Sequence, residues 1–508
     1  MLSTLLPTSL RVIAVLLGAA PALILAARVI YRLRFHPLAQ FQGPWYAAAT
    51  SLTLAALSLV RLDIVWIEYL VKKYGRRHPI RIQPNLLLFP HPSALKEIYC
   101  DPKCNTKSSM YGTGVFGPPH LFSTLDGDKH RELRKSLGGA PWTIGSLKNN
   151  WEPRFDDHVL LLCQKLKENA DANEPVILCD RVAQFAADIV TMLLFTEPFG
   201  FVRNARDERR ILETWRQSLN IFAFASRFNF FHYYLARIPG FSTLFFPKKT
   251  DVYGMGWLMG ESERQVNERQ ALVQRGLAPK IPDFLQHCLD ARLDKKPLSQ
   301  SQKEAHVTLF VQAGSDTTAT ALGSTLRFLI VHSEKLGRAT QEINQAYRSG
   351  LLSTPVKYEE TRQHLPYIAA CIKEALRLQP PATNLFGRVV PKGGKIIGGH
   401  YIPPGVEITS TACVVQRDPE VFHPDPHLFR PERWLDRNKA AEMDTAIFSF
   451  GIGPRTCLGR DIAHMELYKV IPELIRRFHF DLVEPGEYLV VSGVGYNINL
   501  TVNLTPRL

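Results

Sequence analysis

The chain has 508 residues, 45% of them hydrophobic and 21% charged, close to the average for globular proteins, which excludes a fibrous or disordered chain. Its 61 Lys and Arg residues exceed its 47 Asp and Glu residues, and the net charge of +14 favours an anionic membrane or an acidic protein as partner. It has neither a basic run with interleaved aromatics nor zinc-finger spacing, so we expect no nucleic-acid partner. The eight scattered cysteines argue against a disulfide framework and for a reducing compartment.

The first predicted element is an apolar helix near the N-terminus. The uncharged run 12–27 has an arginine at each end, which can extend it to the roughly 20 residues that span a bilayer. We therefore predict residues 1–34 as a membrane anchor with a transmembrane helix at about 10–30. More basic residues follow the run than precede it, which places residues 35–508 in the cytosol. The alternative is a cleaved secretory signal.

Most of the remaining chain has the apolar periodicity of three to four residues that is typical of helices, while strand patterns are short and few. An apolar stretch at 47–60 favours a helix lying on the membrane or on the protein. The predicted fold class is mainly α (α+β), a large helical body with small β-sheets and without a Gly-rich nucleotide loop. Predicted helices are 128–138, 155–170, 180–195, 207–222, 251–275, 300–333, 335–349, 366–379 and 460–477. Predicted strands are 80–83, 86–89, 388–390, 395–397, 407–411 and the tail around 490–503.

The longest predicted helix has an unusual centre. Residues 313–318, Ala-Gly-Ser-Asp-Thr-Thr, place poor helix formers in a row. A local rule broken inside a long helix indicates a site. The small residues let the helix distort and make room for a diatomic ligand, while Asp316 and Thr317 offer a carboxyl and a hydroxyl group for proton delivery. The alternative is a polar helix face whose Thr hydroxyls bond back to the preceding turn.

Two charged residues share a face of the predicted helix 366–379. Glu374 and Arg377 are three residues apart, and Pro366 suits the start of this helix. Considered alone, they would be an ordinary solvated pair that contributes little to stability.

The strongest motif is residues 450–459, Phe-Gly-Ile-Gly-Pro-Arg-Thr-Cys-Leu-Gly. The helix that opens near Gly459 and the N–H groups of a tight turn would stabilise a thiolate at Cys457. The first two glycines permit positive φ angles and a close approach of the backbone to a flat macrocycle. Phe450 can shield the sulfur, and Arg455 can pair with an anionic group of that ligand. The alternative is a plain turn with a buried thiol.

Together these motifs carry a resemblance that extends over essentially the whole chain. The pattern Phe-x-x-Gly-x-Arg-x-Cys-x-Gly at 450–459 closely resembles the haem loop of the cytochrome P-450 superfamily. The Asp-Thr pair at 316–317 is similar to the superfamily's acid–alcohol pair. Glu374 and Arg377 resemble its Glu-x-x-Arg motif, and Arg433 stands where the third member of that network is expected.

The resemblance implies a haem-thiolate monooxygenase with heme b. It hydroxylates or oxidises a lipophilic small molecule with O2 and with electrons from NADPH. No flavin or nicotinamide domain is visible, so the implied electron donor is a separate NADPH–cytochrome P-450 reductase. The connector 36–39 and the Asp-Thr-Thr helix look most like filamentous-fungal, microsomal-type members of secondary-metabolite pathways, which suggests a terpenoid, polyketide or alkaloid substrate. We expect a single catalytic domain, 35–508, on the cytosolic side of the endoplasmic reticulum membrane.

The resemblance also assigns roles to residues. Asp316 and Thr317 are the expected catalytic pair, and Cys457 is the expected axial iron ligand. The superfamily usually carries Trp where this chain has His130, a departure that puts the role of His130 in doubt. The expected structural network is Glu374, Arg377 and Arg433. The expected cofactor-binding residues are Cys457, Arg455, Arg134, His130, Arg388, Phe450, Gly451 and Gly459.

The substrate pocket and the docking surface are less specific expectations. The segments expected to line the pocket are 110–122, 217–231, 306–314, 382–386 and 493–496. Phenylalanines that can face the bilayer or simply pack are Phe222, Phe224, Phe228, Phe230 and Phe231. Basic residues that can dock the reductase, or form only a solvated face, are Lys129, Arg131, Lys135, Arg455 and Arg460.

Two rival functions remain. A haem-thiolate isomerase or dehydratase would rearrange a peroxide without a reductase, but such relatives tend to lose the Asp-Thr pair that this chain keeps. A non-enzymatic haem-binding sensor or electron carrier would leave the apolar pocket segments without a use.

Overall fold

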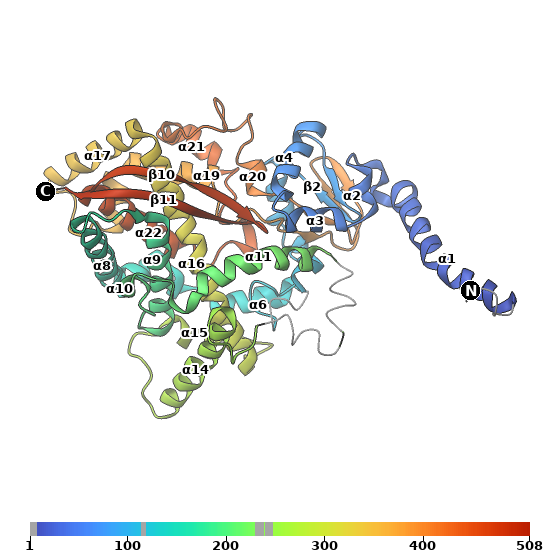
Figure 1. Cartoon of the computed structure of the whole chain (residues 1–508), viewed down its shortest axis with the longest axis horizontal. Coiled ribbons are helices and arrows are strands. Elements are labelled where there is room, and N and C mark those ends of the chain that lie inside the picture. Colours follow the sequence, from blue (N-terminus) through green and yellow to red (C-terminus); the bar gives the residue numbers. More distant parts are fainter. Residues whose placement is uncertain (1–7, 113–117, 229–237, 239–246, 508) are drawn as a thin grey trace, which may run out of the picture.

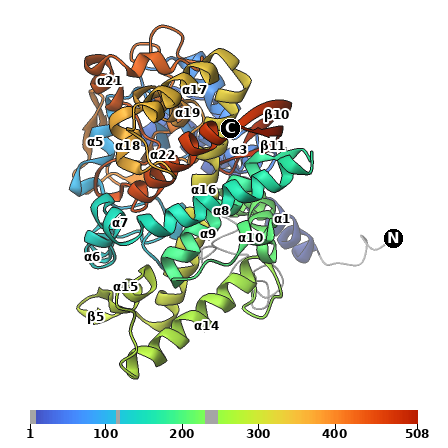
Figure 2. The same cartoon turned by 90° about the vertical axis from the view of Figure 1, so that its left-hand side faces the viewer.

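The computed structural model describes residues 8–112, 118–228, 238 and 247–507, with side chains from residue 19 onward. The N-terminal helix α1 (Thr8–Ile30) extends away from the body, and the C-terminus lies at the opposite end of the long axis (Figure 1). A long hairpin of β10 (Phe478–Val491) and β11 (Val494–Pro506) crosses the helical body. Figure 2 shows α14 (Gly254–Gln274) on the side of the body opposite α17 (Ser333–Arg348).

The body is mainly helical, and its strands are short apart from the C-terminal hairpin. The remaining helices are α2 (Trp45–Ala49), α3 (Leu52–Leu59), α4 (Asp63–Tyr74), α5 (Ala94–Tyr99), α6 (Gly127–Leu137), α7 (Ile144–Asn150), α8 (Glu152–Asp171), α9 (Leu178–Phe195), α10 (Phe201–Asn204), α11 (Ile211–Arg227), α15 (Phe284–Asp290), α16 (Gln300–Val331), α18 (Tyr358–His364), α19 (Pro366–Leu378), α20 (Ala412–Val415), α21 (Arg437–Asp444) and α22 (Arg460–Arg477). The remaining strands are β1 (Ile80–Gln83), β2 (Leu86–Leu88), β3 (Val176–Ile177), β4 (Arg292–Leu293), β5 (Lys296–Pro297), β6 (Arg388–Val389), β7 (Lys395–Ile397), β8 (His400–Ile402) and β9 (Glu407–Thr409).

The predicted helices are confirmed, with small shifts at their ends. The largest shifts are at α11, which was predicted as 207–222 and extends over Ile211–Arg227. The carboxylate of Asp207 accepts the backbone N–H groups of Leu212 and Glu213, so this residue caps the helix and is not part of it. The apolar stretch 47–60 forms two short helices, α2 and α3, that pack against β1.

The predicted transmembrane helix corresponds to α1. No helix in the part of the chain that the structure describes is both long and apolar enough to cross a membrane, so the transmembrane prediction is not supported. Beyond α1 the chain joins the body. Arg32, just after α1, donates a hydrogen bond of 2.6 Å to the carbonyl of Ala49 in α2.

The sheets are small. One sheet has the strand order β1-β2-β9-β6, in which β2 and β9 are parallel and the other neighbours are antiparallel. A second has the order β10-β11-β3. The prediction of strand around 490–503 covered only part of this second sheet, whose first strand contains Pro485 and Gly486, residue types that favour turns. They lie inside β10, where Gly486 has φ 61° and a Cβ there would meet the carbonyl oxygen of Ile498 at 2.4 Å.

Helix α16 runs through the middle of the molecule and organises the core. It packs against α9, α14, α19, α22 and β11. Nearly all of α9 is buried with it in the largest hydrophobic cluster. This arrangement packs α19, which carries the Glu-Arg motif, and α22, which follows the cysteine loop, against the same helix that carries the Asp-Thr segment.

Candidate active site

The cysteine loop is a closed turn whose shape depends on glycine. The backbone N–H of Cys457 donates to the carbonyl of Phe450 at 2.8 Å, which joins the two ends of the loop. Gly451 and Gly453 have φ 64° and 71°. A Cβ on Gly453 would meet the carbonyl oxygen of Tyr99 at 2.1 Å, so only glycine fits this close approach. Gly459 then forms the N-cap of α22.

The electrostatic setting of Cys457 suits a metal ligand. Its side chain is solvent-exposed on one side, while the enclosing protein raises the pKa of its thiol by desolvation. The backbone N–H of Gly459 and the guanidinium of Arg134 act in the opposite direction and favour the thiolate. Arg134, on α6, also donates a hydrogen bond to the carbonyl of Thr456. A coordinated metal ion would complete the deprotonation of this sulfur.

Arg455 turns inward from the same loop. Its guanidinium donates to the backbone carbonyls of Asn105 at 2.9 Å, Thr124 at 3.0 Å and Leu125 at 3.1 Å. Desolvation, followed by the charge of Arg388, lowers the pKa of Arg455 to about 9. The prediction that Arg455 belongs to a docking surface is therefore wrong, because its charge faces the interior.

Three further basic side chains gather beside Arg455. Arg388, on β6, is 4% exposed, and in the described part of the chain it donates only to the carbonyls of Phe386 and Gly387. Lys107 is equally buried, and its backbone forms a bridge with Arg388. The nearby imidazole is neutral: desolvation, followed by the charge of Arg455, lowers the pKa of His130 to about 3. The Nδ1 atom of His130 is buried and has no hydrogen-bond partner among the residues that the structure describes.

The charge of this cluster is not balanced by protein carboxylates. Arg134, Arg388, Arg455 and Lys107 form no ion pair within the described residues, and the residues outside the described ranges include no Asp or Glu. The carboxylate of Asp126, which acts on Arg455 through its charge, already caps α6. Buried cations require a compensating anion. A sulfur ligand beside uncompensated cations fits haem, whose iron takes a thiolate and whose propionates are anionic.

The Asp-Thr segment lies on α16, which remains α-helical through residues 313–318. The expected helix distortion is therefore absent from this described segment. The hydroxyl of Thr317 donates to the carbonyl of Ala313 at 2.6 Å, and Ser315 bonds back to Val311 in the same way. These bonds match the alternative interpretation of this segment, a polar helix face whose hydroxyls bond back to the preceding turn. Ala313 is nevertheless solvent-exposed in the middle of a buried helix, so this face of α16 borders open space.

The carboxylate of Asp316 points toward α11. Its side chain is 2% exposed, and the Nη2 atom of Arg216 lies 2.6 Å from its Oδ1 atom. Arg216 also lies over the ring of Tyr496, 5.2 Å from its centroid. In this structure the acid is therefore paired with a base on a second helix.

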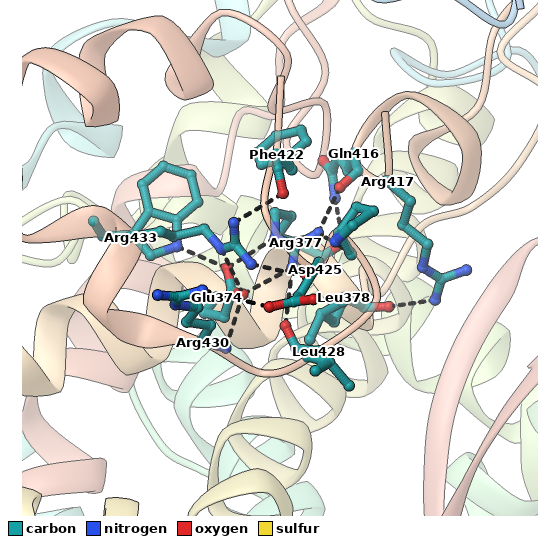
Figure 3. A network of polar contacts seen from close by, with 12 residues as sticks. Glu374, Arg377, Leu378, Gln416, Arg417, Phe422, Asp425, Leu428, Arg430 and Arg433 are labelled. Atoms are coloured by element: carbon teal, nitrogen blue, oxygen red, sulfur yellow. Dashed lines mark hydrogen bonds and ion pairs between the residues drawn. The ribbon is translucent and has the colours of Figure 1, made fainter. Parts of the chain in front are cut away.

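The Glu-Arg network is assembled around α19 (Figure 3). Both carboxylate oxygens of Glu374 accept from Arg377, at 2.7 and 2.8 Å, and Arg433 donates to one of them at 3.0 Å. The side chains of Glu374 and Arg377 are fully buried. Arg377 continues to the carbonyl of Gln416, whose side-chain oxygen accepts the backbone N–H of Phe448 at 2.6 Å. The network thus reaches the segment that leads into the cysteine loop.

The sequence reasoning missed three residues of this region, Lys107, Arg216 and Gln416. A buried cation has no local sequence signature, and the partners of these residues are far away along the chain. For Arg216 the available signal was its place in an amphipathic helix, where its position lies on the buried side. No comparable signal was present for Lys107 or Gln416.

The expected pocket segments are partly brought together. A small cavity of about 30 Å³ is lined by Met110, Arg227 and Leu385, from the segments 110–122, 217–231 and 382–386. The parts 113–117 and 229–231, with Phe230 and Phe231, lie outside the described residues.

Comparison with known proteins assigns the family of enzymes to which this fold and site belong. The cytochrome P450 family profile, written P-450 here, matches residues 66–489. Cytochrome P-450 monooxygenase gsfF of Penicillium aethiopicum is 30% identical, with 93% of this chain and 95% of that protein covered. Monooxygenase ABA1 of Pyricularia oryzae is 31% identical over 89% of each chain, and cicH of Emericella nidulans is 28% identical over 91% and 92%. The chain belongs to the cytochrome P-450 family of monooxygenases.

Proposed function

We propose that this monooxygenase binds heme b through Cys457 and oxidises a lipophilic small molecule with electrons from NADPH, delivered by a separate reductase. The observation that carries the proposal is the cysteine loop beside a buried cluster of cations without protein counter-ions. When bound, the haem supplies oxygen activation, with one oxygen atom entering the substrate and the other leaving as water. The chain is similar to fungal monooxygenases, and we propose a secondary-metabolite intermediate as its substrate, of the terpenoid, polyketide or alkaloid class.

The chain's own residues prepare the site. Gly459 N–H and Arg134 stabilise negative charge on the Cys457 sulfur. Arg388 and Arg455 would hold the propionates, with His130 as a further neighbour, while Phe450 and Gly451 shape the loop. Thr317 holds a proton on its Oγ1 atom, which it donates to the Ala313 carbonyl until another acceptor is present. Once its pairing with Arg216 is loosened, the carboxylate of Asp316 would take up a proton from solvent and pass it on to this region.

We place the enzyme at the cytosolic face of the endoplasmic reticulum membrane. Large apolar side chains are exposed on α1 and on the helices next to it, which supports contact with lipid. They include Leu23, Leu25, Phe35, Trp45 and Val65.

The exposed side chains of Lys129, Arg131 and Lys135 on α6, with Arg460 at the start of α22, support docking of an acidic reductase. Turnover driven by a reductase should therefore fall steeply as salt is raised. Reversing the charge of Lys135 should reduce that salt dependence. A turnover rate that does not respond to salt would contradict the proposed docking surface. It would not contradict the proposed oxidation reaction.

The first test is the absorption spectrum of the dithionite-reduced, carbon monoxide-bound protein. We expect a long-wavelength Soret band in the wild type and its loss in Cys457→Ala. A folded, haem-loaded wild type without this band would overturn thiolate ligation. Consumption of NADPH with reductase then separates a monooxygenase from an isomerase or dehydratase, and conversion of a substrate separates an enzyme from a haem-binding sensor.

A further inference from the structure

Lys107 is a buried cation in an unusual place. It lies between two short helical turns, Pro102–Cys104 and Ser109–Gly112, and it is 4% exposed. Its backbone N–H donates to the carbonyl of Leu125 at 3.0 Å, which fixes this segment beside the N-terminal end of α6. A lysine in such a position loses most of the hydration of its ammonium group.

The surroundings of the ammonium group compensate only part of that loss. Nζ donates to the carbonyl of Phe122 and lies 4.0 Å and 3.9 Å from the ring centroids of Tyr111 and Phe122. A carbonyl and two ring faces stabilise a cation but carry no negative charge. An ammonium group has three donors, and the single hydrogen bond that Nζ makes within the described residues leaves two of them for another ligand.

The neighbouring positive charges raise the free-energy cost of burying the charged ammonium group of Lys107. Arg388 and Arg455 both act on Lys107 as like charges, and desolvation, the largest effect, also lowers its pKa. Within the described residues no carboxylate pairs with Lys107, and the chain has no Asp or Glu elsewhere that could do so. Since an unpaired buried charge costs several kcal/mol, an anion that the polypeptide does not provide would stabilise the site.

We propose that Lys107 binds a propionate of the haem, next to Arg388 and Arg455. The inference rests on the proposed haem site and adds a residue to it. It also accounts for the departure at position 130, because the imidazole of His130 is neutral and flanked by cations, and Lys107 supplies a charged donor on the same side of the cluster. Lys107 therefore acts in cofactor retention, and we assign it no step in the oxidation.

The test is the rate at which the holoenzyme loses haem to excess apomyoglobin. Lys107→Met keeps the aliphatic stem against the two rings and removes the charge. We expect haem loss to be roughly 10- to 100-fold faster, as for one lost charge-assisted hydrogen bond. Lys107→Arg should keep a nearly wild-type rate. Lys103→Met, four residues earlier at an exposed position, is the matched control and should have no effect.

A second measurement separates propionate binding from a merely structural role. Wild type and Lys107→Met are each loaded with haem dimethyl ester, whose propionates carry no charge. If Lys107 binds a propionate, the difference between the two proteins should largely disappear with the ester. The same difference with free-acid haem and with the ester would show that Lys107 only supports the Phe122 carbonyl, and would overturn the proposal.

The remaining outcomes are also decisive. Wild-type haem loss in Lys107→Met overturns the proposal, as does a failure of both Lys107→Met and Lys107→Arg to fold. A Lys107→Met protein that is isolated folded but without haem, while Lys107→Arg is isolated loaded, supports it. The carbon monoxide spectrum of the same wild-type sample reports on thiolate ligation separately, so a failure of the proposed function is recognised independently of the Lys107 result.

Discussion

Arg216 on α11 and Asp316 on α16 form a buried two-nitrogen ion pair. The Nε and Nη2 atoms of Arg216 both donate to Oδ1 of Asp316, at 3.0 and 2.6 Å. The pair joins a helix that carries part of the expected pocket wall to the helix that carries the expected proton-delivery residues. A movement of α11 would therefore change the partner of Asp316.

Arg216→Met should destabilise the protein by roughly 3–5 kcal/mol, because it leaves the Asp316 carboxylate buried without a counter-ion. The measurement is the Tm of the holoenzyme. The double variant Arg216→Met with Asp316→Asn should recover much of the loss, since no buried charge remains. Arg210→Met, which breaks an exposed pair with Glu213 on the same helix, should leave the Tm unchanged. Equal losses in the two single variants would contradict a special role for the buried pair.

Thr317→Ala should lower the product formed per NADPH consumed by up to about 100-fold, the lower end of a proton-transfer contribution. Thr317 holds its proton against the Ala313 carbonyl on a face of α16 that borders open space. Thr317→Ser keeps the hydroxyl and should retain most of the coupling. The ratio of product to NADPH, measured with reductase and a converted substrate, distinguishes the two. If Thr317→Ala forms as much product per NADPH as the wild type, the hydroxyl of Thr317 has a purely structural role.

The secondary structure was predictable because the spacing of apolar residues along the chain indicates helices and strands locally. The predictions for α16 and α22 agree with the structure within two residues at each end. The errors occurred where a local signal competed with tertiary pairing. Pro485 and Gly486 are residue types that favour turns, yet both lie within β10, the long strand that pairs with β11. At α16 the small and polar residues suggested a distorted helix, and back-bonding hydroxyls instead accompany a regular one.

The candidate site was predictable only where a motif places its residues close together in sequence. Cys457 and the loop glycines are within ten residues of each other, and Glu374 and Arg377 share one helix turn. The link from Arg377 through Gln416 to the cysteine loop depends on contacts between distant segments, as does the pairing of Arg216 with Asp316. No spacing rule encodes such contacts, so they become visible only in the fold.

Glu374→Gln should destabilise the protein by roughly 3–5 kcal/mol and lower its haem content. It leaves the guanidinium groups of Arg377 and Arg433 buried without their shared carboxylate. Haem per protein and Tm are the two readouts. The matched control is Glu268→Gln, which removes an exposed pair with Arg264 and should change neither. If Glu374→Gln is destabilised but keeps a normal haem content, the network does not determine the shape of the cysteine loop.

His306 provides a pH dependence whose sign follows from its burial. Its side chain is fully buried, with Nδ1 donating to the carbonyl of Gln302 at 2.7 Å and Nε2 accepting the backbone N–H of Leu121 at 3.0 Å. Desolvation lowers the pKa of His306 to about 4, from the usual value near 6.5. Below pH 6.5 the unfolded chain therefore binds a proton that the folded protein does not.

The contribution of His306 to stability is complete above pH 6.5 and is lost as the pH falls toward 4, at up to about 1.4 kcal/mol per pH unit. His306→Gln, which can keep one of the two hydrogen bonds, should start from a lower Tm at pH 7.5 and lose less of it on acidification to pH 5. His479→Gln, at an exposed position on β10, should retain the wild-type slope. Because other groups also titrate in this range, the decisive quantity is the difference in slope between variant and wild type. Parallel curves for wild type and His306→Gln would show that His306 binds its proton equally well in the folded and the unfolded chain.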